Sequence, residues 1–523
     1  MPIPPREDIV PRYVLERNAA RSPSGRMAIF EDGSTWTWAE GLRAARIAAN
    51  SLRDRGVGEG DPVAVMVANG PDFLRAWLGV TFLGGVLVPL NTAFKGGLLE
   101  HAIGITAPVL AVSIGEAAER MRIASPDLRI LDVEELTLGS DIDPLLERPI
   151  EAWDTHHYMF TSGTTGPSRA ARNTYLQFAM LGSWATTEMG LDETDVFLID
   201  LPLFHGSALS MAAGSFRAGA SIAVRAMPAM TAYWETAGRS GATVGFLLSS
   251  MVGFLLGQPE TDADVKHSLR IMISAPLPAD PEAFMMRFGV QQIITAYGSS
   301  EVAAAIANVP GGRLVHGSCG QVRPGFEARL VDDNDIPVVT GEVGELILRH
   351  ESPWTITTDY IGMPEATAKA WRNGWFHTGD LMRVDDDANF FLVDRVKDAL
   401  RRRGENVSTF EVEREVATHP AVAEVACLGY PSPSGDDDVK VVLVVRPEAA
   451  LDLREFAAYL VDRMPHFMVP RYYEIVDRLP KTETMKVQKY VLRAAGNTAA
   501  TWDLEVDGGL KVTRSGLVHL PVG

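Results

Sequence analysis

Cysteine is almost absent from this sequence. Among 523 residues only Cys319 and Cys427 are cysteines, and they lie far apart, outside any Cys-x-x-Cys pattern. This spacing argues against a disulfide framework and against a cysteine-based zinc site. The histidines, including the neighbours His156 and His157, also lack the spacing of zinc ligands. The composition is typical of a reduced, cytoplasmic protein.

Long apolar runs are missing as well. Two uncharged stretches invite comparison with a membrane span: residues 76–90 cover 15 positions and residues 241–257 cover 17. Both are shorter than the roughly 18–20 apolar residues that a spanning helix needs, and Gly-Gly or Ser-Ser pairs interrupt them. Residues 1–8 show no charged-then-apolar leader pattern. We expect neither a membrane span nor a secretory signal.

Basic residues are outnumbered. The chain has 48 Lys and Arg against 67 Asp and Glu, a formal net charge of −19. Nucleic acids and anionic membrane surfaces select clustered Lys and Arg, so neither is expected as a partner. Binding of a single nucleotide stays compatible with this balance, because a glycine-rich loop offers backbone N–H groups without any net positive charge.

What the sequence does contain is a two- or three-domain α/β pattern. Short apolar runs alternate with helical stretches to about residue 320, which predicts parallel sheets covered by helices. A barrel-like module of short alternating runs follows at about 318–394. From residue 395 to 500 the pattern predicts a small α+β C-terminal domain, and residues 501–523 are predicted to be a loose or peripheral tail.

Residues Thr161–Gly166 read Thr-Ser-Gly-Thr-Thr-Gly and follow the apolar run 158–160. Glycines let backbone N–H groups converge on an anion, and hydroxyls add donors to phosphate oxygens. The Gly-Lys-Ser/Thr ending of a Walker loop is missing. Taken alone, the hexamer would equally suit an ordinary turn.

Further motifs follow in a fixed order. They are Pro-Leu-Phe-His-Gly at 202–206, Ala-Tyr-Gly-Ser-Ser-Glu at 296–301, Trp-Phe-His-Thr-Gly-Asp-Leu at 375–381, Asp-Arg-Val-Lys-Asp at 394–398, Arg-Gly-Glu-Asn-Val at 403–407 and the Lys-rich segment 480–489. Together they resemble the adenylate-forming superfamily of acyl- and aryl-CoA synthetases, adenylation domains and luciferase. The resemblance covers roughly residues 7–495 and is closest to the carnitine/crotonobetaine-CoA ligase-like branch.

The resemblance implies an ATP-dependent carboxylate–CoA ligase, with ATP, Mg²⁺ and CoA as cofactors. The acid would first form acyl-AMP with release of pyrophosphate and would then pass to the thiol of CoA. A role in fatty-acid or lipid metabolism would follow. Catalysis would rest on Lys486, Arg395 and Glu301. The implied nucleotide-binding set is Thr161, Ser162, Gly163, Thr164, Thr165, Gly166, Arg169, Ala275, Ala296, Tyr297, Gly298, Ser299, Ser300, Asp380, Arg395 and Lys486.

The resemblance also implies roles for individual residues, and their chemistry suits these roles. Glu301 would bind Mg²⁺ with Thr161, and Tyr297 offers a flat face for adenine. Asp380 can accept hydrogen bonds from both ribose hydroxyls. The charge of Lys486 would bridge the substrate carboxylate and the α-phosphate.

The resemblance also implies that the C-terminal domain is mobile. Its rotation between the two half-reactions would occur at a hinge, Lys397. The segment Gly404, Glu405 and Asn406 would then line the path of the CoA pantetheine.

The predicted acyl pocket consists of Phe204, His205, Gly206, Met251, Ser274 and Ala303. The wall after Glu301 is Val-Ala-Ala-Ala, and the pocket segments contain no Lys or Arg that could hold a second carboxylate. We therefore expect a mostly apolar monocarboxylic acid of medium or bulky size. His205 is assigned to positioning of this acid rather than to proton transfer.

Several positions depart from the family pattern. Arg169 and Ala170 replace a lysine and a glycine, Tyr175 replaces a histidine, and Met485 replaces a glycine. Two alternatives stay open: a stand-alone adenylation enzyme that charges a carrier protein, and a catalytically silent relative, whose only support is the changes at Arg169 and Met485. The chain could assemble as a homodimer.

Overall fold

The computed structural model describes residues 3–161, 168–184, 188–275, 277, 280–308, 311–332, 334–395, 399–403, 405–432, 436–480, 487 and 489–520. The chain forms two compact units. The first comprises Met1–Thr92, Ile105–Phe160 and Ala170–Val396, and the second comprises Ala93–Gly104, Thr161–Arg169 and Lys397–Gly523.

A six-stranded sheet in the order β6-β5-β3-β4-β7-β8 occupies the N-terminal part of the chain. Its strands β3 to β7 pair in parallel. Strands β3, β4 and β5 are short, apolar and almost wholly buried, as expected for a parallel sheet covered on both faces. The strands are β3 (Pro62–Met66), β4 (Val86–Pro89), β5 (Leu110–Ser113), β6 (Ile130–Asp132), β7 (Thr155–Thr161) and β8 (Arg169–Thr174).

A seven-stranded sheet in the order β13-β12-β11-β9-β10-β1-β2 forms the second layer of the first unit. Its pairs are parallel except that of β1 with β2. The strands are β1 (Arg26–Ile29), β2 (Thr35–Thr37), β9 (Val196–Ile199), β10 (Ser221–Val224), β11 (Val244–Leu248), β12 (Ile271–Ala275) and β13 (Gln292–Ile294).

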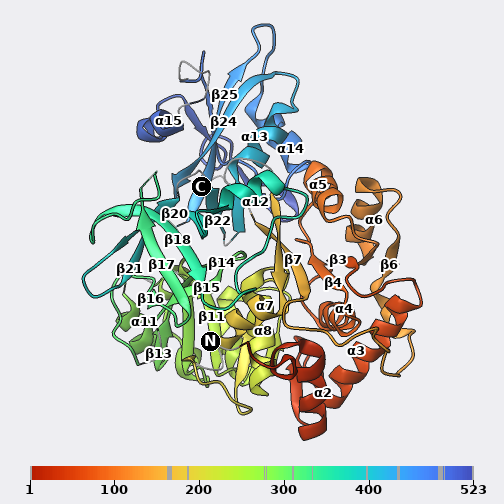
Figure 1. Cartoon of the computed structure of the whole chain (residues 1–523). Coiled ribbons are helices and arrows are strands. Elements are labelled where there is room, and N and C mark those ends of the chain that lie inside the picture. Colours follow the sequence, from red (N-terminus) through yellow and green to blue (C-terminus); the bar gives the residue numbers. More distant parts are fainter. Residues whose placement is uncertain are drawn as a thin grey trace. The chain divides into compact units, whose positions relative to one another are not determined.

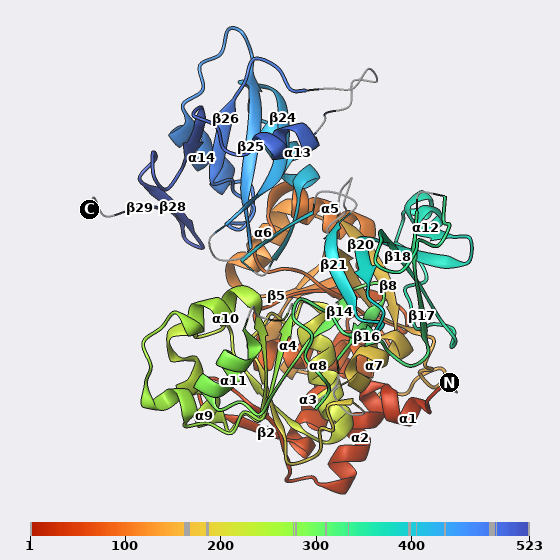
Figure 2. The same cartoon turned by 90° about the vertical axis from the view of Figure 1, so that its left-hand side faces the viewer.

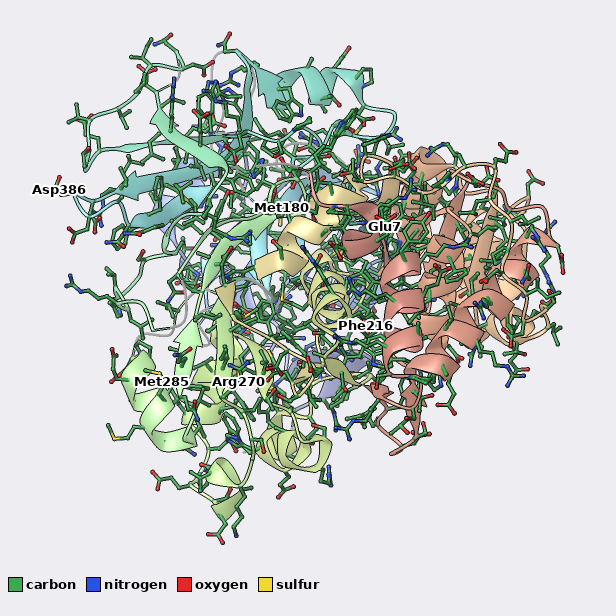
Figure 3. All side chains as sticks on the ribbon, turned by 60° about the horizontal axis from the view of Figure 1, so that its bottom comes forward. Glu7, Met180, Phe216, Arg270, Met285 and Asp386 are labelled. Atoms are coloured by element: carbon green, nitrogen blue, oxygen red, sulfur yellow. The ribbon has the colours of Figure 1, made fainter. Side chains whose placement is uncertain are left out.

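Helices pack between and around these sheets. One apolar core joins Val63 of β3, Ile222 of β10 and the helices α3, α4 and α8, and Figure 1 shows α3 beside α4. The helices α7 and α8 pack together, and Figure 3 labels one residue of each, Met180 on α7 and Phe216 on α8. The helices are α1 (Arg6–Ile9), α2 (Pro11–Arg21), α3 (Trp38–Arg53), α4 (Pro71–Phe82), α6 (Gly115–Ala124), α7 (Tyr175–Ser183) and α8 (Gly206–Ala218).

A separate core covers the other face of the seven-stranded sheet. It combines Leu198, Leu247 and Met272 of the strands with aromatic residues of α9 and α11. The helices are α9 (Tyr233–Ser240), α10 (Ser249–Leu256) and α11 (Pro281–Phe288), which Figure 2 shows together. The predicted α/β class with helix-covered parallel sheets is confirmed.

From residue 296 to Arg395 the strands of the first unit pair antiparallel. A three-stranded sheet and a five-stranded sheet complete the first unit, so the predicted change to a barrel-like module is confirmed. The elements are β14 (Ala296–Ser299), β15 (Ala303–Ala307), β16 (Gln321–Val322), β17 (Phe326–Val331), β18 (Val343–His350), α12 (Pro364–Ala370), β19 (Trp371–Arg372), β20 (Trp375–Val384) and β21 (Phe390–Arg395).

The second unit is α+β. A four-stranded sheet, β24-β25-β26-β27, packs with its helices around the buried residues Phe456 and Tyr473. Its elements are β22 (Ala399–Arg402), β23 (Glu405–Ser408), α13 (Thr409–Ala417), β24 (Val422–Pro431), β25 (Asp437–Val445), α14 (Leu453–Val461), β26 (Tyr472–Ile475), α15 (Lys489–Ala495), β27 (Thr501–Asp503), β28 (Leu510–Thr513) and β29 (Gly516–His519); α5 (Gly96–Thr106) begins in this unit.

The C-terminal segment is not the loose tail that its composition predicts. β27 adds a strand to the sheet beside β26, and β28 pairs with β29 as a hairpin. Leu504, Leu510 and Val512 join the core of the second unit, and the buried Lys440 donates a 2.6 Å hydrogen bond to the carbonyl of Gly496. The prediction of a loose tail is wrong because apolar residues of this segment are buried in the core of the second unit. Within the described ranges, no helix is long and apolar enough to cross a membrane.

Candidate active site

The Ala-Tyr-Gly-Ser-Ser-Glu motif forms β14 and the turn into β15. Gly298 stands opposite Ala304, and Ser299 stands opposite Ala303. A side chain at Gly298 would place its Cβ 1.9 Å from the carbonyl oxygen of Ala303. Only glycine permits this close approach of the two strands. The hairpin thus brings the predicted nucleotide residues Ala296 to Ser300 against the predicted pocket residue Ala303.

Glu301 lies at the end of this motif and is nine-tenths buried. Its Oε2 accepts a hydrogen bond from the hydroxyl of Ser299 at 2.8 Å, and its Oε1 accepts one from the hydroxyl of Tyr360 at 3.0 Å. Its carbonyl oxygen accepts a 2.8 Å hydrogen bond from the side-chain amide of Gln177. Carboxylate and backbone are therefore both held in place.

The surroundings of Glu301 fit a Mg²⁺ ligand. Both carboxylate oxygens face neutral hydroxyls, and within the described residues no Lys or Arg forms an ion pair with this carboxylate. No cluster of three or more His, Cys, Asp or Glu able to hold a metal occurs in the part of the chain described. One carboxylate is nevertheless sufficient for Mg²⁺, which takes the rest of its ligands from phosphates and water.

Asp380 lies on β20 and is 5% exposed. Its Oδ2 accepts a 2.6 Å hydrogen bond from the hydroxyl of Tyr297, so the two motif segments meet through these side chains. In the β20–β21 pair Asp380 stands directly opposite Arg395. Only the backbone of Arg395 is described. The strand register therefore brings together two residues that the sequence assigns to the same nucleotide.

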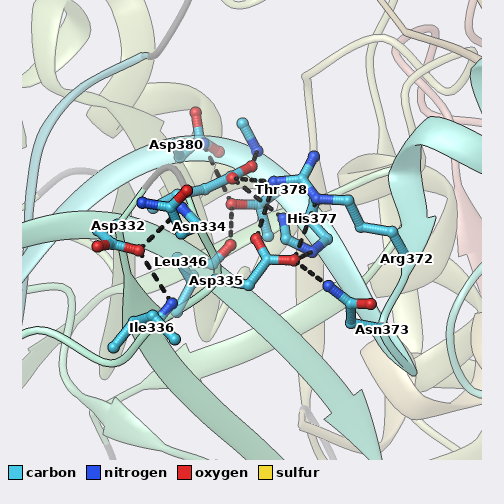
Figure 4. Close-up of polar contacts among 12 residues, drawn as sticks. Asp332, Asn334, Asp335, Ile336, Leu346, Arg372, Asn373, His377, Thr378 and Asp380 are labelled. Atoms are coloured by element: carbon cyan, nitrogen blue, oxygen red, sulfur yellow. Dashed lines mark hydrogen bonds and ion pairs between the residues drawn. The ribbon is translucent and has the colours of Figure 1, made fainter.

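A polar network fixes the part of β20 that precedes Asp380 (Figure 4). The N–H of Gly379 donates a 3.1 Å hydrogen bond to Oε1 of Glu345, and the other oxygen of Glu345 lies 3.0 Å from Nδ1 of His377. Gly379 has a φ of +74°, a backbone conformation that favours glycine. The hydroxyl of Thr378 accepts from the N–H of Asp380 and donates to the carbonyl of Leu346.

A second acidic residue anchors the outer part of this network. Arg372 donates hydrogen bonds to Asp335 at 3.0 Å and to Glu345 at 3.4 Å, and Asn373 also donates to Asp335 (Figure 4). The hydrogen bond from Arg372 lowers the pKa of Asp335. The charge of Arg372 is thus paired with the carboxylates of Asp335 and Glu345, and Glu345 in turn contacts Gly379, the residue before Asp380.

The predicted pocket residues Phe204, His205 and Gly206 lie at the start of α8. Phe204 is buried, and its ring centroid lies 4.7 Å from that of His205. The backbone before them is held by Asn69, whose side chain donates to the carbonyl of Leu201 and accepts from the N–H of Leu203 at 2.7 Å. His205 caps α8 through its backbone.

The other pocket residues come from β12, α10 and β15. Ser274 and Ala275 end β12, Met251 lies on α10, and Ala303 begins β15, whose residues are buried throughout. The carbonyl of Ala304 accepts a 2.8 Å hydrogen bond from Arg323. The guanidinium of Arg323 also pairs with Glu188 at 2.6 Å, so its charge is offset by a carboxylate.

In the second unit, Thr161 and Arg169 flank the predicted phosphate loop. Next to Arg169, the N–H of Ser168 donates a 2.9 Å hydrogen bond to Oε1 of Glu411, and its carbonyl lies 2.8 Å from Nε2 of His101. Glu405 begins β23. For Asn406, also on β23, only the backbone is described. The predicted residues that lie outside the described ones are Ser162, Gly163, Thr164, Thr165, Gly166, Lys397, Gly404 and Lys486.

The adjacent His156 and His157 form a neutral pair in the core. Trp77 donates its indole N–H to Nε2 of His156, so the ring proton of His156 lies on Nδ1, which faces Nδ1 of His157 at 2.7 Å. Burial lowers the pKa of His157 to about 3 and that of His156 well below its ordinary value. These histidines have a structural role.

Four supporting residues carry no motif signal. Gln177 and Tyr360 hold Glu301, Glu345 holds the part of β20 that precedes Asp380, and Asn69 holds the segment before Phe204. Each is a single polar residue in a region that reads as helix, loop or strand. A neighbouring apolar pattern would not have identified any of them.

Comparison with known proteins identifies the family of this chain. Residues 15–358 match the family model described as AMP-binding enzyme, and residues 411–486 match the AMP-binding enzyme C-terminal domain. The chain belongs to the AMP-binding enzyme family. It is 30% identical over 468 residues to crotonobetaine/carnitine–CoA ligase of Salmonella typhi, covering 85% of this chain and 90% of that protein. The ligase of Escherichia coli O139:H28 is 30% identical over 462 residues, covering 84% and 89%.

Solved structures of AMP-binding enzymes share the fold. The o-succinylbenzoate CoA synthetase of Bacillus subtilis, bound to a product analogue, superposes with a TM-score of 0.83 at 24% identity, covering 92% of this chain and 98% of that one. An anthranilate CoA ligase in complex with anthranoyl-AMP gives a TM-score of 0.70 at 25% identity, covering 96% and 99%. The predicted superfamily and its carnitine-ligase-like branch are confirmed. The chain is an ATP-dependent acid–CoA ligase of the AMP-forming class.

Proposed function

We propose that this enzyme activates a mostly apolar monocarboxylic acid of medium or bulky size. A carboxylate oxygen of the acid attacks the α-phosphorus of ATP, and pyrophosphate leaves. The thiol of CoA then attacks the acyl carbon, and AMP leaves with that carboxylate oxygen. The observation that carries the proposal is the joined pair of hairpins in which Tyr297, Asp380 and Glu301 are buried and held by hydrogen bonds.

The nucleotide is assigned to these hairpins. The Asp380 carboxylate suits the ribose hydroxyls, since a carboxylate accepts several hydrogen bonds. Arg395, opposite Asp380 in the strand register, suits ribose or phosphate oxygens through its planar fork of donors. Glu301 would hold Mg²⁺, and the bound ion would supply positive charge to the phosphates of ATP.

Lys486 is assigned to the adenylation step, in which two anions must approach each other. Lys397 is assigned to the hinge of a mobile domain at 395–500, and the segment Gly404 to Asn406 is assigned to the pantetheine of CoA. Thr161 and the hexamer that it begins are assigned to the phosphates of ATP. A cytoplasmic location and a homodimer complete the proposal.

The apolar acid follows from the pocket walls. Val302, Ala303, Ala304 and Ala305 are all buried and lack polar side-chain atoms. Arg323 reaches this strand from outside the predicted pocket set, and its guanidinium is bound to Glu188 and to backbone carbonyls. A second carboxylate in the substrate would therefore find no matching charge among these residues.

A panel of acids tests the substrate assignment. The enzyme is incubated with ATP, Mg²⁺ and hydroxylamine, with and without CoA, over straight, branched, alicyclic and aromatic acids of graded size, with carnitine, acetate and a dicarboxylic acid as comparisons. We expect the highest kcat/KM for an apolar acid of six or more carbons, roughly 100-fold above acetate, at about 0.8 kcal/mol for each buried methylene. Acetate, a dicarboxylate or a free amino acid as best substrate would contradict the proposal.

A further inference from the structure

The C-terminal hairpin contacts the loop that we assign to CoA. Nη1 of Arg403, in the turn between β22 and β23, donates a 3.2 Å hydrogen bond to the carbonyl of Val512 on β28. Val512 faces the core of the second unit, which fixes the hairpin there. Arg514 follows two residues later, in the tight turn closed by the pair of Thr513 with Gly516. Two segments more than 100 residues apart thus lie in contact, and the charges of both Arg403 and Arg514 act on His466.

Arg403 adopts a left-handed backbone conformation, with a φ of +54°. Such a conformation is uncommon for a residue other than glycine and strains the backbone. Its neighbour Arg402 is buried and is bound to Asp438 at 3.0 Å and to the carbonyl of Val469 at 2.5 Å. The strained turn therefore presents an exposed arginine on a rigid base.

The local charge differs from that of the chain as a whole, whose net charge is −19. His466 reports this field: burial and then the charges of Arg514 and Arg403 lower its pKa to about 4. Glu405 opposes this effect and Arg402 adds to it. At neutral pH the imidazole is uncharged, so the positive charge of the region comes from its arginines.

We propose that Arg403 and Arg514 bind a phosphate group of CoA. The proposal rests on the proposed function, because it takes the loop after Arg403 as the CoA loop. Guanidinium groups bind phosphate through paired N–H donors, and two of them can hold a dianion. Arg514 lies beyond residues 411–486, the part matched by the C-terminal family model.

Direct binding separates the phosphates of CoA. Calorimetry with CoA, dephospho-CoA and pantetheine compares the 3′-phosphate, the diphosphate and the thiol arm, first with the unmodified enzyme and then with Arg514→Gln. We expect the variant to bind CoA about tenfold more weakly, the loss of one charged hydrogen bond, with a smaller effect on pantetheine. Arg514→Lys, which keeps the charge but loses the fork, should fall between the two.

The matched control is Arg446→Gln. Arg446 donates a hydrogen bond to the carbonyl of Pro420. It directly follows β25, whose other end carries Asp438, the partner of Arg402. The variant therefore removes the same charge at the other end of that strand. Loss confined to CoA assigns the arginines to the 3′-phosphate, and equal loss for CoA and dephospho-CoA assigns them to the diphosphate. Equal weakening of pantetheine, or no weakening at all, would overturn the proposal. Since binding is read without turnover, an enzyme that binds CoA in this way yet forms no thioester would refute the proposed function alone.

Discussion

The hydroxyl of Tyr297 donates a 2.6 Å hydrogen bond to Oδ2 of Asp380. The bond joins the β14–β15 hairpin to the β20–β21 hairpin, two segments separated by 83 residues in sequence. The aromatic ring packs in the core beside Ile306 and Phe326, so its position is fixed from behind. Tyr297 therefore orients the carboxylate that we assign to ribose, in addition to any contact with adenine.

Tyr297→Phe should weaken nucleotide binding. The ring and its packing are kept, and only the hydrogen bond to the Asp380 carboxylate is lost. We expect the KM for ATP to rise about tenfold, the size of one hydrogen bond to a charged group, while the KM for CoA changes little. Steady-state kinetics with pyrophosphate release measures both. A change in the KM for CoA alone would show that Tyr297 acts elsewhere.

Tyr360→Phe should weaken the binding of Mg²⁺ by Glu301. It removes the 3.0 Å hydrogen bond to Oε1 without altering the ring. We expect the Mg²⁺ concentration for half-maximal rate to rise about threefold or more, since a ligand carboxylate that loses its partner is held less firmly. A titration with Mg²⁺ at saturating ATP reads the effect. An unchanged Mg²⁺ requirement would remove Tyr360 from the account.

Glu345 should act as a positioning residue for Asp380. Glu345→Gln keeps an acceptor for the N–H of Gly379 but loses the charge that faces Arg372 and His377. Glu345→Leu loses both. We expect the KM for ATP to rise only about twofold in the first variant and about tenfold in the second. Equal effects, or loss of thermal stability without a change in KM, would indicate a purely structural role.

The parallel sheets could be predicted because apolar runs and helical spacing dictate them. The run at Pro62–Met66 and the helix at Trp38–Arg53, which Thr37 and Glu40 cap, need only local information. The hydrogen bond of Tyr360 to Glu301 spans 59 positions, and that of Gln177 to the same residue spans 124. No local pattern encodes such pairs. They depend on which strands the fold brings together.

The C-terminal segment shows the limit of composition. Residues 501–523 are predicted to be a loose or peripheral tail, yet Trp502 pairs across from Tyr473 in the sheet. Glu474 accepts hydrogen bonds from Thr498 and Thr501, and it pairs with Lys440 at 2.6 Å. These contacts close the edge of a sheet formed by distant residues. Their energy comes from partners that the segment's own composition does not reveal.

Asp200 should make the fold less stable at high pH. It is 2% exposed, and both carboxylate oxygens lack a hydrogen-bond partner among the described residues. Burial raises its pKa to about 7, against smaller opposing effects of the backbone N–H groups of Asp200 and Leu201 and of the charge of Arg225. The folded state therefore binds a proton that the unfolded chain releases near pH 4. The stability from this proton is complete below about pH 4 and is lost as the pH rises through 7.

Asp200→Asn tests this dependence. The variant cannot ionise, so between pH 5.5 and 8 its free energy of unfolding should fall by less than that of the unmodified enzyme. We expect a difference on the order of 1–3 kcal/mol, read by urea denaturation at both pH values. Asp192→Asn, at a solvent-exposed turn, is the control. Parallel pH profiles for the unmodified enzyme and Asp200→Asn would contradict the prediction.

Lys486→Ala should affect one half-reaction. The charge is needed where the acid carboxylate meets the α-phosphate, so adenylation should fall by about 100-fold or more. Transfer from preformed acyl-AMP to CoA should fall far less. Rapid-quench assays of the two steps separate these outcomes. Equal losses in both steps would count against the assignment.

The central claim is that the reaction passes through an acyl-adenylate, and an isotope experiment tests it most directly. The best acid from the panel is labelled with ¹⁸O in its carboxylate and incubated with the enzyme, ATP, Mg²⁺ and CoA. The account predicts AMP that carries one ¹⁸O, unlabelled pyrophosphate, and acyl-CoA that retains the other ¹⁸O, as read by mass spectrometry. Formation of ADP, or AMP without the label, would contradict it.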